Sequence, residues 1–268
     1  MNIFYEMASR LGFYKDVKNC LLKGFTPCAV TGVSNIHKAQ TAMALSRLSP
    51  CLVICDDEAS AIRMTGDINE MAGEQLACVF PAKDLNFAYM EGVSREYEHK
   101  RLEALSLITQ GKCKIIAASM EACLQGTIPQ DKLKEFSFGI KTGGELSLEE
   151  LTNKLLAGGY TRTDQVEGQA QFSVRGSIAD IFPVQESRPV RIELWGDEVD
   201  SISYFDPESQ RRTDPIDEIM VFPALEIIFP DTDDLVTKLE ALSKSVRGSR
   251  TDKIRTNISR PSGQCRFY

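Results

Sequence analysis

The chain has 268 residues, of which 43% are hydrophobic and 26% charged, so it has enough apolar material for two folded domains and is not disordered. Its 31 basic and 38 acidic residues give a net charge of −7, which excludes a protein held on nucleic acid by its overall field. No stretch approaches the roughly 18 apolar residues of a membrane span, and Met1–Arg10 lacks a secretory signal pattern, so we expect a cytoplasmic protein without a membrane partner.

Residues 1–128 are predicted to form an α/β domain with a parallel sheet. Apolar positions at helical spacing predict helices within residues 1–24, with Gly12 and Gly24 as their stops. Strands and helices then alternate, which is typical of a parallel sheet covered on both faces. The predicted strands are Pro27–Thr31, Pro50–Cys55, Gln75–Phe80 and Lys114–Ser119, and the predicted helices are His37–Leu48, Glu58–Met71 and Ser94–Thr109.

Residues 129–222 are predicted to form a smaller α+β domain. A helix over Ser147–Ala157 starts with a capping box completed by Glu150 and ends at Gly158-Gly159. After this helix, apolar residues recur at every second position, with turn residues such as Gly196-Asp197 between the runs. The pattern predicts an antiparallel sheet that has one solvated face and packs on a helix with the other.

The charge follows the same division of the chain. Residues 1–128 hold 13 basic and 14 acidic side chains, whereas residues 129–222 hold 10 and 18. Residues 223–268, with 8 basic and 6 acidic side chains, contain one helix-like segment, Asp231–Val246, and a basic tail. Because this last part lacks the apolar repeats of an independent domain, we expect it to return to the first domain and to belong to a longer protein.

The eight cysteines favour neither a disulfide framework nor a metal site. No two are spaced as Cys-x-x-Cys. Cys51 and Cys55 lie about 13 Å apart if their run is a strand, because each residue of a strand advances by about 3.3 Å. With His37 and His99 as the two histidines, we expect reduced thiols, no metal and no cofactor.

The segment Gly32-Val-Ser-Asn-Ile-His37-Lys38-Ala39 lies between a predicted strand and a predicted helix, where a phosphate-binding loop would be. Gly32 and Lys38 match G-x-x-x-x-G-K-[ST], but His37 replaces the second glycine and Ala39 lacks the hydroxyl that holds Mg²⁺. Backbone N–H groups need that glycine to curl around phosphate, so we expect a degenerate, non-functional loop. A working nucleotide loop is the alternative.

Asp56 follows the apolar run Cys51–Cys55 and permits two enzyme interpretations, a Walker B acid or the ribose-binding acid of a dinucleotide fold. The second lacks its glycine fingerprint, because the segment from Thr31 to Asn35 offers a single glycine. An acidic strand end is also an ordinary helix start, since carboxylates there interact favourably with the helix dipole. We favour the helix start, and no nucleophile motif or acid–base pair predicts catalysis.

Arg191, Glu193 and Trp195 occupy alternate positions of one predicted strand, on the face opposite its apolar residues. Arg175 likewise lies opposite the apolar residues of an earlier strand. Trp195 is the one tryptophan of the chain, and Trp and Arg are the types most enriched at binding hot spots. Two interpretations stay open: a docking face, or a Trp195 half-buried beneath a neighbouring element with the arginines in surface ion pairs.

Two stretches resemble a signature shared by UvrB and the transcription-repair coupling factors. The first contains Gly158-Gly-Tyr160-Thr-Arg162-x-Asp164-Gln165-Val166 and Phe172-Ser-Val-Arg175-Gly176-Ser-Ile-Ala-Asp180-Ile-Phe182-Pro183. The second contains Pro189-Val-Arg191-Ile-Glu193-Leu-Trp195-Gly-Asp197-Glu198-Val-Asp200-Ser-Ile and Phe205-Asp206-Pro207-x-x-Gln210-Arg211. The resemblance is dense over residues 158–225 and loose over residues 1–130.

Departures from UvrB favour the coupling-factor family. UvrB keeps an intact phosphate loop and an aromatic-rich hairpin that inserts into DNA. This chain has the degenerate segment Gly32–Ala39 and too few residues between Phe80 and Arg95 for that hairpin. It is therefore similar to the N-terminal UvrB-like module of the coupling factor Mfd. The resemblance fades after residue 230, and Arg260–Tyr268 resembles no sequence of the family.

The resemblance implies a helicase-like (RecA-like) α/β scaffold, a smaller UvrA-binding domain, and a non-catalytic adaptor that recruits UvrA in transcription-coupled nucleotide excision repair. The family's UvrA-facing positions fall on Arg175, Arg191 and Trp195, the last usually Phe in the family. Other implied partners are the rest of the Mfd chain, and RNA polymerase and DNA through domains farther along it. Two alternatives remain: a nucleotide-dependent enzyme using Gly32, Lys38 and Asp56, and a UvrB-like module that binds damaged DNA.

Overall fold

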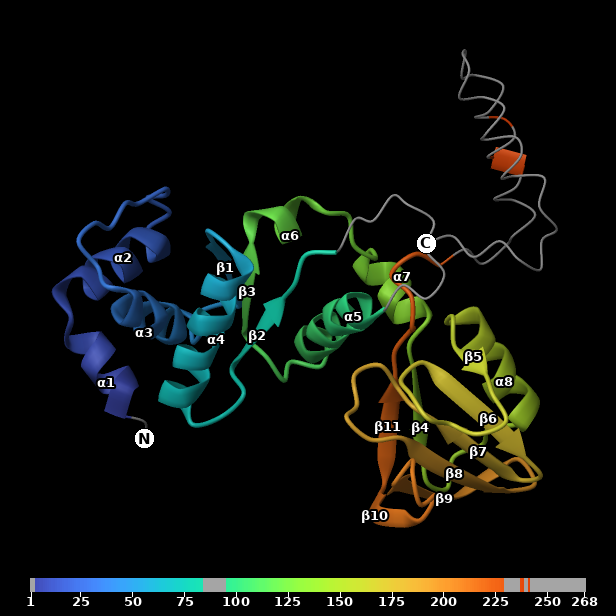
Figure 1. The fold of residues 1–268 in the computed structure, drawn as a ribbon. Coiled ribbons are helices and arrows are strands. Elements are labelled where there is room, and N and C mark those ends of the chain that lie inside the picture. The colour runs from blue at the N-terminus through green and yellow to red at the C-terminus, as the bar shows by residue number, and fades with distance from the viewer. Residues whose placement is uncertain (1–2, 84–94, 229–236, 239–240, 242–268) are drawn as a thin grey trace. The chain divides into compact units, whose positions relative to one another are not determined.

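The computed structural model describes residues 3–83, 95–228, 237–238 and 241. The chain divides into two compact units, residues 1–226 and 227–268, and the first unit contains the helices and strands described below (Figure 1). The helix predicted over Asp231–Val246 lies outside the described residues except at three positions.

A three-stranded parallel sheet forms the centre of the first half of this unit. Its strands are β1 (Cys51–Cys55), β2 (Ala77–Phe80) and β3 (Ile115–Ser119), in the order β1-β3-β2. The central strand β3 pairs with both neighbours, so that Ile115 lies beside Cys51 on one side and Ala77 on the other. The predicted parallel arrangement is confirmed for these three strands.

Helices pack on both faces of the parallel sheet (Figure 1). α3 (Asn35–Leu45) and α4 (Glu58–Ala72) cover one face, and α5 (Glu96–Thr109) and α6 (Met120–Leu124) pack on the other. α1 (Ile3–Arg10) joins the first layer through α3, and α2 (Gly12–Leu22) packs on α1. The core on the α3–α4 face includes Ala39, Met43, Ile68, Met71 and Ile115, and the core on the α5 face includes Cys78, Phe80, Ala104, Ala118 and Ala122.

Two predictions for the first 32 residues are wrong. Pro27–Thr31 does not form a strand, and all five residues are exposed. Pro27 has no backbone N–H to donate to a neighbouring strand. Val30 is the one large aliphatic side chain of the run, so burial of the segment would offset little of the conformational entropy lost in ordering it. Gly12 does not stop a helix but begins α2, one residue after the single-residue break at Leu11.

A six-stranded sheet forms the centre of the second half of the unit, in the order β10-β9-β8-β7-β6-β5. Neighbouring strands are antiparallel except for the parallel pair β5–β6, so the predicted antiparallel sheet is confirmed. Gly196, with a φ of 63°, lies in the turn between β8 and β9. The strands are β5 (Thr161–Arg162), β6 (Gln171–Arg175), β7 (Ile178–Ile181), β8 (Val190–Trp195), β9 (Glu198–Phe205) and β10 (Arg212–Ile216).

α8 (Leu148–Ala157) begins at the predicted cap, because the Ser147 hydroxyl accepts a hydrogen bond from the Glu150 backbone N–H at 3.1 Å. Beyond its end, Gly159 has a φ of 86°, and a Cβ there would lie 2.5 Å from Cγ of Leu225. Glycine is therefore required at this position. The sequence did not predict α7 (Gln130–Glu135), nor the antiparallel pair of β4 (Phe138–Lys141) and β11 (Glu218–Val221).

A buried ion pair ties the end of this unit to α5. Arg101 is fully buried and donates from Nε to Oε1 of Glu226 at 2.8 Å. Its Nη1 donates to the Pro81 carbonyl at 2.7 Å, and its guanidinium lies 3.9 Å from the centre of the Phe80 ring. Lys83 forms a second ion pair with Glu226. The chain therefore returns to the first half at residue 226.

Candidate functional site

One face of the six-stranded sheet carries a row of polar side chains across four strands. Ser173, Asp180, Arg191 and Ser203 are successive cross-strand neighbours on β6, β7, β8 and β9. The adjacent row, Val174, Ala179, Ile192 and Ile202, belongs to the opposite, apolar face, because side chains alternate along a strand. The predicted division of the sheet into a polar and an apolar face is therefore observed at these strands. The expectation that the polar face is solvated is wrong for this row, because Ser173, Asp180 and Ser203 are buried.

One carboxylate joins the two arginines of this face. Asp180 is 1% exposed and accepts hydrogen bonds from Arg191 in a bidentate arrangement, Nε to Oδ1 at 2.7 Å and Nη2 to Oδ2 at 2.9 Å. Nη2 of Arg175 donates to the same Oδ2 at 2.8 Å. The hydrogen bond to Asp180 raises the pKa of Arg191 above its usual value. We call these three residues the arginine clamp.

The two arginines of the clamp differ in how far their side chains are exposed to solvent. The Arg191 side chain is 12% exposed, its Nη1 donates to the Gln210 carbonyl at 3.1 Å, and its guanidinium lies 4.7 Å from the centre of the buried Phe205 ring. The Arg175 side chain is 52% exposed. Arg191 is thus mostly enclosed by the sheet, whereas Arg175 reaches the surface.

Trp195 ends β8 and is 84% exposed. The interpretation of Trp195 as a half-buried side chain is therefore wrong for the described structure. The other half of that interpretation, arginines in surface ion pairs, is met in part: both arginines are ion-paired, but their shared carboxylate, Asp180, is buried. Arg191 and Trp195 are four residues apart on β8, so their Cα atoms lie about 13 Å apart on one face.

Sequence reasoning missed Asp180 and Gln210. Asp180 stands in the apolar strand Ile178–Ile181, and a charged residue in such a strand is a signal that a cation lies opposite. Gln210 has a positive φ of 58° in the connection between β9 and β10, and its carbonyl meets Arg191 there. A tertiary contact of this kind leaves no pattern in the sequence.

The segment Gly32–Ala39 is placed at the start of α3. Gly32 and Lys38 are exposed, and His37 Nδ1 lies 2.9 Å from the Ser34 hydroxyl. Ala39 is fully buried in the core between α3 and α4, so a larger side chain there would need repacking. The expected strand before the segment is absent, as described above.

The carboxyl end of β1 brings together two acids and one cation. Burial and the carboxylates of Asp56 and Asp57 raise the pKa of the Cys55 thiol, and the opposing charge of Lys38 lowers it. Asp57 caps α4 by accepting a hydrogen bond from the Ser60 backbone N–H at 2.6 Å. The acidic strand end thus serves as a helix start at Asp57, as predicted.

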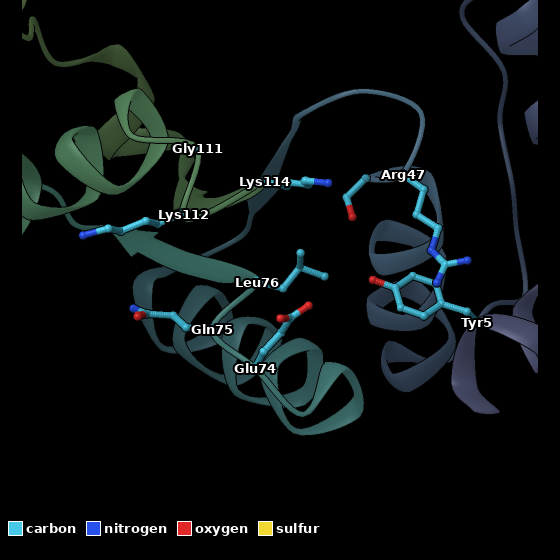
Figure 2. Close-up of a pocket in the computed structure, with 9 residues that line it drawn as sticks. Tyr5, Arg47, Glu74, Gln75, Leu76, Gly111, Lys112 and Lys114 are labelled. Atoms are coloured by element: carbon cyan, nitrogen blue, oxygen red, sulfur yellow. The ribbon is translucent and has the colours of Figure 1, made fainter. Parts of the chain in front are cut away.

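A cavity of about 370 Å³ lies at the opposite, amino-terminal ends of the three parallel strands (Figure 2). Ligands of open α/β sheets bind outside the carboxyl ends of the strands, so this cavity is not in the position of a nucleotide site. The Arg47 guanidinium stacks 3.6 Å from the centre of the Tyr5 ring at its edge. Other lining residues include Glu74, Gln75, Lys112 and Lys114.

Among the described residues, no cluster of three or more His, Cys, Asp or Glu side chains could hold a metal ion. Within the same part of the chain, no helix is long and apolar enough to cross a membrane. The seven described cysteines are free thiols. The Cys78 thiol donates to the Ile115 carbonyl at 3.8 Å and the Cys113 thiol to the Gln75 carbonyl at 3.7 Å; the neighbouring Cys113 thiol and burial raise the pKa of Cys78.

Residues 138–226 match the family model of the UvrB interaction domain. The chain is also similar to the transcription-repair-coupling factors of three bacteria. It is 29% identical to the Bacillus subtilis protein over 217 residues, 80% of this chain and 18% of the relative. The corresponding values are 30% over 207 residues, 75% and 18%, for Haemophilus influenzae, and 28% over 232 residues, 85% and 20%, for Staphylococcus haemolyticus.

Both comparisons confirm the resemblance inferred from the sequence. The chain spans about a fifth of the length of the curated relatives it matches. The arginine clamp and Trp195 lie within the matched residues 138–226.

Proposed function

We propose that this chain is a docking module of a transcription-repair-coupling factor and recruits UvrA in transcription-coupled nucleotide excision repair. The observation that carries the proposal is Trp195, an 84% exposed indole at the end of β8 within the matched domain. Exposure of a large apolar ring to water is unfavourable in free energy, and burial of the ring in a pocket of a partner would remove that cost. Tryptophan is also enriched among the residues that dominate binding free energies.

The three residues of the predicted site have different roles in this proposal. Trp195 is the anchor that inserts into the partner. Arg175, whose side chain is 52% exposed, offers its remaining N–H groups to a carboxylate or carbonyl of the partner. Arg191 acts mainly within the domain, because it holds Asp180 and supports the face that presents the other two.

The module is proposed to be non-catalytic. Its first half would be a helicase-like scaffold whose phosphate loop, Gly32–Ala39, has lost the second glycine and the Mg²⁺-binding hydroxyl. The burial of Ala39 in the α3–α4 core supports this proposal. In a full-length, cytoplasmic Mfd chain, contacts with RNA polymerase and DNA would belong to other parts of the protein.

A binding measurement with purified UvrA tests the proposal. By isothermal titration we expect the chain to bind UvrA, and Trp195→Ala to weaken binding by about 1–3 kcal/mol with an unchanged melting temperature. Leu156→Ala is the matched control, because Leu156 is also an exposed apolar side chain but lies on α8. Equal binding by both variants would contradict the proposal.

A further inference from the structure

Four exposed acidic residues lie near Trp195 along the hairpin of β8 and β9 and at the bridge that joins β9 to residue 145. Glu198 is its direct cross-strand neighbour, and Asp197 lies in the turn that joins β8 to β9. Glu145 forms an isolated antiparallel bridge with Glu198, and Asp200 lies two residues farther along β9. We call Glu145, Asp197, Glu198 and Asp200 the acidic ring.

The charges of the acidic ring are not compensated within the described part of the chain. All four side chains are exposed, and none of them forms an ion pair with another described residue. Elsewhere on the same face the charges are paired, since Asp180 is held by the arginine clamp and Glu193 pairs with Arg212. A negative electrostatic field is therefore concentrated at the turn between β8 and β9, beside Trp195; we call this end of the hairpin the tip.

The acidic ring also carries an internal cost. Glu145 and Glu198 are bridge partners, and like charges directly opposite each other destabilise a sheet. Cations of a partner placed over the tip would relieve this repulsion. An indole face attracts the same cations, because its negative quadrupole interacts favourably with guanidinium and ammonium groups within about 6 Å.

We infer that the surface that docks on Trp195 is basic, with an arginine or lysine stacked on the indole and neighbouring cations paired with the acidic ring. This inference rests on the proposed function, since it specifies the chemistry of the partner at the same face. The acidic ring repels nucleic acid phosphates, so the partner surface is that of a protein.

The local field can be measured on the protein alone, because Trp195 is the one tryptophan and its fluorescence reports this position. At low ionic strength we expect caesium ions to quench Trp195 more efficiently than iodide, relative to neutral acrylamide. The double reversal Asp197→Lys with Glu198→Lys should raise iodide quenching about twofold. Glu70→Lys, an exposed acid on α4, is the control and should change nothing. Equal iodide quenching in the wild type and the double reversal would overturn the inference.

The basic partner surface is tested by the kinetics of UvrA association. We expect the double reversal to lower the association rate about tenfold at low salt and to flatten its salt dependence. Trp195→Ala should instead raise the dissociation rate and leave the salt dependence intact. If UvrA binds and the double reversal associates as the wild type does, this inference is overturned and the proposed function stands. If UvrA does not bind the wild type, both are overturned.

Discussion

Replacement of Arg191 by alanine should destabilise the protein far more than replacement of Arg175, although both arginines bind the same carboxylate. Arg191→Ala removes two hydrogen bonds of 2.7 and 2.9 Å from a carboxylate that is 1% exposed. Breaking a buried pair by removing one partner costs about 3–5 kcal/mol, because the other charge stays buried. Arg175 remains 2.8 Å from Asp180, so we expect a loss of about 2–4 kcal/mol in the free energy of unfolding.

Arg175→Ala provides the comparison. Its side chain is 52% exposed, and Asp180 keeps the bidentate contact with Arg191, so the expected loss is below about 1 kcal/mol. Arg191→Lys should be more stable than Arg191→Ala, because it keeps a positive charge beside Asp180. The recovery should be only partial, because an ammonium cannot reproduce the planar fork of a guanidinium. Urea unfolding followed by far-ultraviolet circular dichroism measures all three variants, because the exposed Trp195 is a poor reporter of the core.

The same measurement can refute this reasoning. If Arg191→Ala and Arg175→Ala lower the free energy of unfolding by the same amount, below about 1 kcal/mol, the clamp is not a buried ion pair in solution. A double variant, Asp180→Asn with Arg191→Ala, tests the coupling directly. It should cost less than the sum of the two single changes, because each single change leaves the other buried group without its partner.

Three further predictions concern other parts of the chain. Lys38→Ala should leave UvrA binding unchanged in titration calorimetry, and the unaltered chain should bind Mg-ATP no tighter than about 1 mM; micromolar binding would revive the nucleotide-dependent enzyme. Arg101→Leu should cost about 3 kcal/mol of stability, because Glu226 stays buried. Lys100→Leu loses an exposed pair with Glu96 and a 5.7 Å contact with the Tyr97 ring, and should change stability by less than about 0.5 kcal/mol in urea unfolding. Burial, and secondarily the charge of Arg95, lower the pKa of His99, so the unfolded state takes up its proton first as the pH falls below about 6.5. The melting temperature should therefore drop between about pH 7 and pH 5.5 more in the wild type than in His99→Gln, and an identical drop would contradict this assignment.

The hydrophobic pattern was sufficient to predict where the strands of the parallel sheet lie, but not their burial, because Leu52 and Ile54 of β1 are exposed. The strands β1, β2 and β3 are short apolar runs, and they form in the predicted places. Pro27–Thr31 failed because a run with one large aliphatic residue and a proline resembles a strand in sequence without enough surface to bury. The β4–β11 pair was not predicted because its strands are separated by the whole second sheet, and pairing over such a distance leaves no local signal.

The sequence predicted which residues of β8 lie on the polar face of the candidate site, but not their contacts or their burial. Alternation along β8 placed Arg191 and Trp195 on the polar face, which the structure has. It could not distinguish a side chain that is 12% exposed from one that is 84% exposed, because the difference comes from the neighbours. Asp180 encloses Arg191 from β7, and Gln210 approaches it from the connection after β9. Burial on a polar face is a tertiary property.

The contacts of Arg101 have a consequence for protein engineering. Its Nη2 lies 3.4 Å from the Gly126 carbonyl, while the Thr127 hydroxyl donates to Oε1 of Glu226 at 3.3 Å. The side chains of Thr127, where the chain leaves the first half, and of Glu226, where it comes back, thus meet in one hydrogen bond. A segment whose ends lie so close together can be excised and its gap bridged by a few glycines and serines, or inserted into a surface loop of an unrelated host. We therefore predict that residues 128–225 can be transplanted as a cassette, and that a fluorescent or enzymatic host carrying it will display Trp195 without the rest of the chain.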